Sequence, residues 1–435
     1  MATSPPQTRA RIGFDHDEDP PSPRHAPRPP RRRRPVSRRV RVRRRRIAAA
    51  VAVVLAVLIV WLGISLGGAL TNPALGSSVS ARFAEWARDH GFATVVNWAE
   101  NQWYAHHQPP KGGRPPKGAI PTGPAATLPT PVGPPHLAVP AAVVSPASPP
   151  LAGEGQWHAA GRLVGGIPAV YEAFVRPDTI HTSEVVGIAW MDTKLLHATL
   201  YSGSYIPGGG PYTHTAPVSP TAATSLVAAF NAGFRIDQSE GGYFTDGRVI
   251  QALVPGQASF VIYRDGSATV GQWGRDVTLT PNVVAVRQNL SLLVDNGQPV
   301  PGLQSTDTTK WGLTLGNNEY VWRSGVGVTA DGALVYVGGP SLNITTLADL
   351  LVRAGAVRAM ELDINTDWVQ YSTYDPTSAA GAASAANGSS LLSGMAGDPS
   401  RYFQAWWSRD FFTMSAAPGN SATGAAARHA AGAPG

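Results

Sequence analysis

The residues best suited to chemistry lie in the segment 360–368, which alternates apolar and polar side chains. If residues 357–363 form a strand, Glu361 and Asp363 point to the same face, because successive strand side chains alternate between faces. Two residues advance a strand by about 6.6–6.8 Å. Two carboxylates at such a range are typical of acid and base catalysis at a glycosidic bond. This pair is therefore the first candidate catalytic site.

The same segment also offers oxygen ligands for a metal ion. Asp363, Asn365 and Asp367 form the pattern Asp-x-Asn-x-Asp, which resembles the start of a calcium-binding loop. That loop requires Gly at its sixth position and Glu at its twelfth, where this chain has Trp368 and Tyr374. A looser site for a divalent cation stays open, and so does the interpretation that these are turn residues closing a strand. No cofactor is assigned beyond that open cation.

Two more places carry polar residues beside apolar runs. Asn231 follows the run 226–230, and Gly233 permits a turn or the close approach of a ligand. Arg323 and Ser324 enter an alternating apolar segment. Asn231 could bond its own backbone in a turn. Arg323 could form a salt bridge, or offer a fork of donors to a phosphate or carboxylate.

Composition excludes several kinds of site and partner. The chain has 435 residues and no Cys, which excludes disulfides, thiolate zinc sites and a cysteine nucleophile. Its net charge of +7 is uneven. Residues 1–46 hold 15 Arg and 4 acidic residues, a net of +11, whereas the rest holds 20 basic and 24 acidic residues, a net of −4. The basic character belongs to one tail, so a nucleic-acid-binding domain is disfavoured.

An uncharged, mostly apolar run of 24 residues covers 47–70. About 20 such residues span a bilayer core, whereas the apolar region of a cleaved signal peptide has about 7–15. We therefore predict an uncleaved single-pass anchor in the cell membrane. The arginines at 43–46 predict a cytoplasmic N-terminus and an extracytoplasmic main domain, and they could also attract anionic lipid.

Shifts in composition divide the chain into six segments. Aromatic residues near helical spacing at 79–107 predict a helical stalk that breaks at Gly91. It could lie at the membrane interface, pack on the folded domain or meet a partner helix. The 14 Pro of 109–153 predict an extended spacer. The segments are a disordered Arg/Pro-rich cytoplasmic tail (1–46), a transmembrane helix (47–70), the amphipathic stalk (71–108), a Pro-rich linker (109–153), the folded domain (154–376) and an Ala/Gly/Ser-rich tail (377–435) with a short aromatic helix at 398–414.

The folded domain is strand-rich with a few helices. Ser219 with Pro220 predicts the start of a helix that runs through Leu226, and Thr345 or Thr346 the start of another that ends at Gly355. We predict an α+β domain with a mixed, mainly antiparallel sheet. Four dipeptides predict tight hairpin turns, namely Asp246-Gly247, Asp265-Gly266, Asn296-Gly297 and Asp331-Gly332.

Seven short segments occur in the order of a known family pattern over roughly half the chain. They are Asn231-Ala-Gly-Phe234, Asp246-Gly-Arg248, Arg323-Ser324, Thr329-Ala-Asp-Gly332, Leu347-Ala-Asp-Leu350, Gly355-Ala-Val357 and Glu361-Leu-Asp363. The set resembles the phosphodiester glycosidase family, with an N-acetylglucosamine-1-phosphodiester alpha-N-acetylglucosaminidase-like catalytic domain. The resemblance implies a hydrolase that releases a sugar from a phosphodiester.

Two departures from the family pattern fall at the candidate site. Ala232 stands where the family has Gly, and residues 364–366 replace a Gly run. Bulky residues there would narrow the pocket, so either the substrate differs or catalysis is lost. The resemblance implies functional positions at Asn231, Arg323 and Asp363. The full candidate set is Asp363, Glu361, Arg323 and Asn231 as catalytic residues, with Gly233, Ser324, Asn365 and Asp367 as substrate-binding residues.

The function expected from the sequence is a membrane-anchored extracytoplasmic hydrolase of a sugar-1-phosphodiester bond in cell-envelope glycopolymer. The expected partners are a glycan or sugar-phosphate substrate and membrane lipid, but not nucleic acid. One alternative is a non-catalytic module that binds envelope glycan or phosphopolymer. Another is a scaffold whose stalk docks membrane partners.

Overall fold

The computed structural model describes residues 38–123, 133–304, 308–312, 320–377, 381–395, 397–419 and 422–423. The expectations for residues 1–37, and for most of those beyond Gly419, lie outside this range. Two compact units, 1–63 and 64–435, make up the chain. The helices are α1 (Arg38–Thr71), α2 (Val79–Ala87), α3 (Ala93–His106), α4 (Pro220–Ala223), α5 (Ile236–Ser239), α6 (Thr308–Trp311) and α7 (Ile344–Arg353), with 3-10 turns η1 (Pro73–Leu75), η4 (Ala385–Asn387) and η5 (Arg401–Phe403) and a π turn η2 (Arg88–Phe92).

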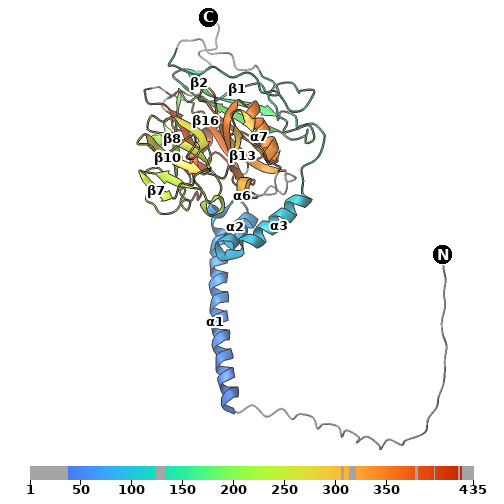
Figure 1. Ribbon diagram of the computed structural model, residues 1–435, viewed down its shortest axis with the longest axis vertical. Coiled ribbons are helices and arrows are strands. Elements are labelled where there is room, and N and C mark those ends of the chain that lie inside the picture. The colour runs from blue at the N-terminus through green and yellow to red at the C-terminus, as the bar shows by residue number, and fades with distance from the viewer. Residues whose placement is uncertain are drawn as a thin grey trace, which may run out of the picture. The chain divides into compact units, whose positions relative to one another are not determined.

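Three sheets build the second unit (Figure 1). The largest has the order β12 (Gln298–Pro299), β11 (Leu292–Asp295), β15 (Ala356–Ile364), β13 (Val321–Thr329), β14 (Leu334–Leu342), β3 (Val186–Met191), β2 (Ile167–Val175), β1 (His158–Val164) and β19 (Ala422–Thr423). The second has the order β7 (Arg248–Gln251), β6 (Tyr243–Thr245), β10 (Val283–Gln288), β8 (Ala258–Tyr263) and β9 (Ala268–Gln272). The third has the order β17 (Gly388–Ser390), β16 (Tyr371–Tyr374), β5 (Leu226–Asn231), β18 (Phe411–Ala416) and β4 (Leu196–Tyr201).

The ladders confirm the expected α+β class. Among the described strands, every pairing within a sheet is antiparallel. All four predicted dipeptides lie between paired strands, in the hairpins β6–β7, β8–β9, β11–β12 and β13–β14. Asp246 and Asn296 adopt φ of 51° and 50°, which are the positive values that such turns need.

The large sheet is buried on both faces. On β14, Leu334 and Tyr336 belong to the core shared with the other two sheets, whereas Val335 and Val337 belong to a second core under α7. Strands covered on both faces read as continuous apolar runs. Asn343, and not Thr345 or Thr346, caps α7, because its side chain accepts a hydrogen bond of 2.8 Å from the amide of Thr346.

Two expected segments differ in the structure. The helix predicted at 398–414 is wrong, because that stretch holds only the turn η5 and then enters β18, which pairs with β4 and β5 on its two sides. The Asp398 side chain accepts from the amide of Ser400, which makes a local turn. The described part of the Pro-rich segment also packs on the domain, since Val143 is only 3% exposed.

The stalk consists of α2 and α3 with a break between them at Gly91. Gly91 has φ of 84° within the π turn η2 between α2 and α3. The stalk packs on the domain, because the amide and hydroxyl of Ser77 both donate to Asp367 Oδ1. Ser408 Oγ also donates to the carbonyl of Ala74. Among the described residues, α1 is the one helix long and apolar enough to cross a membrane.

Candidate active site

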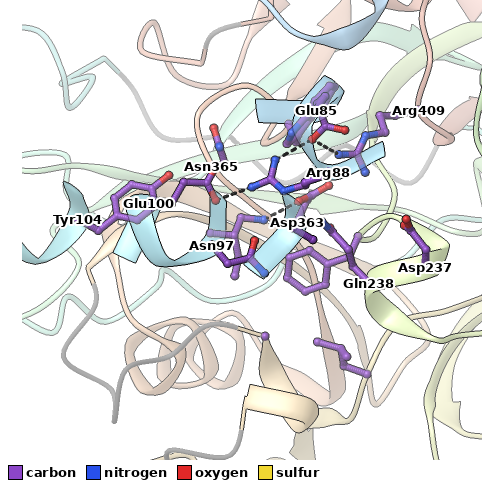
Figure 2. Close-up of a pocket in the computed structure, with 16 residues that line it drawn as sticks. Glu85, Arg88, Asn97, Glu100, Tyr104, Asp237, Gln238, Asp363, Asn365 and Arg409 are labelled. Carbon is purple, nitrogen blue, oxygen red and sulfur yellow. Dashed lines mark hydrogen bonds and ion pairs between the residues drawn. The ribbon is translucent and has the colours of Figure 1, made fainter. Parts of the chain in front are cut away.

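A pocket of about 360 Å³ lies between the stalk and the domain (Figure 2). Its stalk wall comes from α2, η2 and α3, and its domain wall comes from the end of β15 and the segments around α5 and before β18. Charged and polar side chains dominate the lining. They include Glu85, Arg88, Glu100, Asp363, Asn365 and Arg409.

Asp363 reaches this pocket from the end of β15 and is 4% exposed. Its Oδ1 accepts a hydrogen bond of 2.8 Å from the amide of Ile364. Burial raises the pKa of Asp363 from 3.8 to about 8. The charges of Glu85 and Asp410 act in the same direction, and Arg409 acts against them. The carboxyl is therefore protonated at neutral pH and can donate a proton.

Glu85 of α2 is the centre of an arginine cluster. Its carboxylate lies 3.0 Å from Arg88, 2.8 Å from Arg235 and 3.6 Å from Arg409. Burial alone would raise the pKa of Glu85, but Arg409, Arg88 and Arg235 hold it below its ordinary 4.5. Figure 2 shows the contacts of Glu85 with Arg88 and Arg409 beside Asp363. The carboxylate of Glu85 is thus held in the pocket wall by several arginine guanidinium groups.

Arg409 carries the donor group most suited to a ligand. The residue is 6% exposed, and its guanidinium lies 4.1 Å from the ring centroid of Trp368. Its buried Nη1 makes no hydrogen bond with any residue that the structure describes. A buried guanidinium with a spare donor suits a phosphate oxygen, because such charge-assisted hydrogen bonds are short and strong.

The structure places Arg323 and Glu361 against each other, outside the pocket lining. Arg323 Nη1 lies 2.8 Å from Glu361 Oε1, and both side chains are fully buried. Arg323 Nε also donates to the carbonyl of Leu342 at 3.0 Å. Of the two carboxylates expected to work together, the structure brings Asp363 alone to the pocket.

Asn231 supports Asp363 through Ser324. Asn231 Nδ2 donates to Ser324 Oγ at 3.0 Å, and Asn231 Oδ1 accepts from the hydroxyl of Tyr336 at 3.0 Å. Ser324 Oγ bonds both the amide and the carbonyl of Asp363 at 3.2 Å. The Asn and Ser predicted from sequence therefore converge beneath Asp363, in contact with its backbone.

The remaining candidates shape the neighbouring chain. Gly233 lies against Asn289, since an added Cβ would meet the Asn289 side chain at 2.8 Å. Asn289 Nδ2 donates in turn to two carbonyls of β15. Asn365 lines the pocket, and Asp367 accepts the stalk hydrogen bonds from Ser77.

One side-chain oxygen of each residue in the Asp-x-Asn-x-Asp pattern accepts a hydrogen bond within the chain. Asp363 Oδ1 accepts from the amide of Ile364, Asn365 Oδ1 accepts from the amide of Asp367 at 2.9 Å, and Asp367 Oδ1 accepts from Ser77. Across the described ranges, no group of three or more His, Asp or Glu side chains is placed to hold a metal ion.

Sequence reasoning missed the arginine cluster and its partner. Glu85, Arg235 and Arg409 are far apart in sequence, since Glu85 and Arg235 are separated by 150 positions. The sequence held one signal for the cluster, namely charged residues close to tryptophans. Glu85 precedes Trp86, and Arg409 lies two positions after Trp407.

Comparisons with known proteins bear on this domain. No curated protein matches the chain. The catalytic domain of zebrafish N-acetylglucosamine-1-phosphodiester alpha-N-acetylglucosaminidase, solved auto-inhibited by its pro-peptide, is similar at 18% identity and a TM-score of 0.39, over 60% of this chain and 87% of that one. A hypothetical protein from Synechocystis is similar at 12% identity and a TM-score of 0.33, over 57% of this chain and 62% of that one. A putative exported protein from Burkholderia pseudomallei is similar at 14% identity and a TM-score of 0.31, over 53% of this chain and 74% of that one.

The sequence of the domain itself matches a family model. The matched residues are 224–363, and the family is described as phosphodiester glycosidase. This match confirms the resemblance noted in the sequence. It covers β5, with Asn231, and ends at Asp363, the protonated carboxyl of the pocket. Residues 224–363 are therefore similar to the phosphodiester glycosidase family.

Proposed function

We propose that this protein is a membrane-anchored hydrolase that releases a sugar from a glycosyl phosphodiester in the pocket beside Asp363. One observation carries the proposal: a carboxyl that keeps its proton at neutral pH shares a pocket with a buried guanidinium that has a spare donor. The family match supports the same bond as the target. The anchor is α1, with the N-terminus cytoplasmic and the main domain extracytoplasmic.

The reaction breaks the bond between the anomeric carbon and the phosphate oxygen. The hydroxyl of a water molecule adds to that carbon, and the phosphate leaves with the bonding electron pair as a monoester. Asp363 donates a proton to the departing oxygen, and the remaining proton of the water restores it. Asp363 suits this step, because an acid works best with a pKa near the working pH.

Arg409 binds the phosphate oxygens in this scheme, where its spare donor and positive charge stabilise the developing negative charge. Asn231 and Ser324 are positioning residues, since they bond the backbone that carries Asp363. Arg323 and Glu361 fix neighbouring strands through their buried pair, β13 and β15 being hydrogen-bonded neighbours. The proposed substrate class is a sugar-1-phosphodiester of the cell envelope.

The test is the release of sugar and phosphomonoester from N-acetylglucosamine-1-phosphate methyl ester by the full chain purified in detergent. We expect Asp363→Asn to lower kcat by about 10²–10⁴, the usual contribution of a general acid. Asp349→Asn is the matched control, because Asp349 lies on α7 in an exposed pair with Arg353. Equal rates for the wild type and Asp363→Asn would refute the assignment.

A second candidate, a binding module for envelope glycan or phosphopolymer, is favoured by one observation. Ile364 lines the pocket where the family pattern has Gly, which narrows the space for a reacting group. Calorimetry separates the two candidates. Binding of the same phosphodiester without release of sugar would support the binding module.

A further inference from the structure

We propose that the outer face of α3 rests in the membrane interface, so that the pocket lies one helix away from the bilayer surface. The substrate class that follows is a glycosyl phosphodiester whose second ester carries a lipid. This inference rests on the proposed function and its anchor, and it names the substrate of that same pocket. Three observations on the stalk lead to it.

The first is that α3 has two opposite faces. Residues 93, 97, 100 and 104 line the pocket (Figure 2), and they recur every three or four positions along one side of the helix. At 3.6 residues per turn, Val95 and Trp98 fall on the opposite side, and Trp103 falls on the flank between the two faces. Their exposed fractions are 60%, 63% and 59%. One helix thus separates the pocket from a surface that exposes Val95 and Trp98.

The second is that the stalk is bonded to the last turns of the apolar run. Trp86 Nε1 donates to Ser65 Oγ at 2.9 Å, and Arg82 Nη1 donates to the carbonyl of Leu70 at 3.1 Å. Ser65 and Leu70 both belong to the run 47–70. Because Trp86 and the pocket residue Glu85 are adjacent in α2, the pocket wall lies at the level where the apolar run ends.

The third is the chemistry of the exposed surface. Phe83 and Phe92 of the stalk are also 48% and 52% exposed, so four aromatic side chains on α2, η2 and α3 face outward. Tryptophan is enriched at the boundary between lipid and water. Continuity with the apolar run identifies lipid, and not a protein, as the occupant of this face.

The position of the pocket then favours a lipid-linked substrate. A helix is about 10–12 Å across with its side chains. A lipid chain in the bilayer would hold its phosphate and sugar within about that distance of Asp363 and Arg409. Hydrolysis at the anomeric carbon would release free sugar and leave the lipid as its phosphomonoester.

A single-cysteine experiment tests the membrane contact. Because the chain has no Cys, each engineered cysteine is a unique site for an environment-sensitive fluorophore. Val95→Cys and Trp98→Cys are labelled in the full chain, which is reconstituted in phosphatidylcholine–phosphatidylglycerol vesicles. The control is Val249→Cys on β7, an apolar side chain 53% exposed on the domain. We expect doxyl lipid to quench labels 95 and 98 at least threefold more than label 249. Equal quenching at all three sites would overturn the inference, and a protein as the true occupant would give that result.

A kinetic experiment tests the substrate class. The full chain in vesicles is given one sugar phosphate, esterified either to a long-chain lipid or to methyl. We expect kcat/KM to be at least tenfold higher for the lipid ester. The variant Val95→Ser/Trp98→Ser should lose this preference and keep its kcat/KM for the methyl ester, because neither side chain lines the pocket. Equal kcat/KM for both esters in the wild type would overturn this inference and leave the hydrolase proposal standing. No turnover of either ester would overturn both.

Discussion

Replacing Asp363 by Asn should lower activity strongly and stabilise the folded protein at neutral pH. The folded state raises the pKa of Asp363 to about 8, so it holds a proton that the unfolded chain has already lost at pH 7. Asn mimics the neutral acid, and its Oδ1 can still accept from the amide of Ile364. The substitution therefore removes a cost of folding without removing this contact.

The size and sign of the effect follow from the two pKa values. Between pH 3.8 and about 8 the folded state binds one more proton than the unfolded state, so stability falls as pH rises through this window. Each pH unit costs about 1.4 kcal/mol. At pH 7 the accumulated cost is on the order of 4 kcal/mol, and near pH 4 it vanishes. Asp363→Asn should therefore gain several degrees in Tm at pH 7 and almost nothing at pH 4.

Thermal unfolding of the full chain in detergent at pH 4, 5.5 and 7 measures this difference. Asp410→Asn is the matched control, because Asp410 is equally buried but lies 2.6 Å from Arg287. Removing that carboxylate leaves a buried cation and should destabilise by about 3–5 kcal/mol. A Tm gain for Asp363→Asn that does not change with pH, or a loss at pH 7, would refute a protonated Asp363.

Three further predictions concern neighbouring residues. Glu85→Gln should shift the alkaline limb of the kcat–pH profile to lower pH, because the charge of Glu85 helps to raise the pKa of Asp363; an unchanged limb would contradict this coupling. Arg323→Met should lower stability by about 3–5 kcal/mol in thermal unfolding, because it removes the cation that Glu361 faces in a fully buried pair. The double variant Arg323→Met/Glu361→Leu should recover most of that loss, and a double variant as unstable as the single would argue against the charge explanation. Asn365→Val should be less stable than Asn365→Gly by about 1–3 kcal/mol, because both variants lose the hydrogen bond from the amide of Asp367 but only Val is strained at a φ of 88°; equal Tm values for the two would contradict strain at this position.

Local signals in the sequence were sufficient for much of the fold. A dipeptide such as Asp246-Gly247 encodes a tight turn by itself, and Ser219 caps α4 as predicted. The helix predicted at 398–414 was wrong because contacts with distant parts of the chain decide its structure. Its aromatic residues suit a helix as well as a strand, and the ladders with β4 and β5 decide between them.

The candidate site divides along the same line. The position of Asp363 at the end of a strand could be predicted from alternation along β15. The ion pair between Arg323 and Glu361 could not be predicted, because it depends on β13 and β15 being neighbours in the sheet. The arginine cluster was even harder to predict from the sequence, since Glu85 reaches Arg235 and Arg409 only when the stalk packs on the domain.

Residues 364–366, which stand where the family pattern has a Gly run, change the wall of the pocket. Asn365 keeps a positive φ of 88°, and Asn is among the few residues that tolerate this region without being Gly. The backbone after Asp363 therefore passes through a positive φ without a Gly. What changes is the lining, because Ile364 and Asn365 both face the pocket where Gly would leave open space. A positive φ beside Asp363, combined with a wall of Ile364 and Asn365 and a stalk helix opposite, gives this pocket a shape set by side chains where the family pattern has Gly.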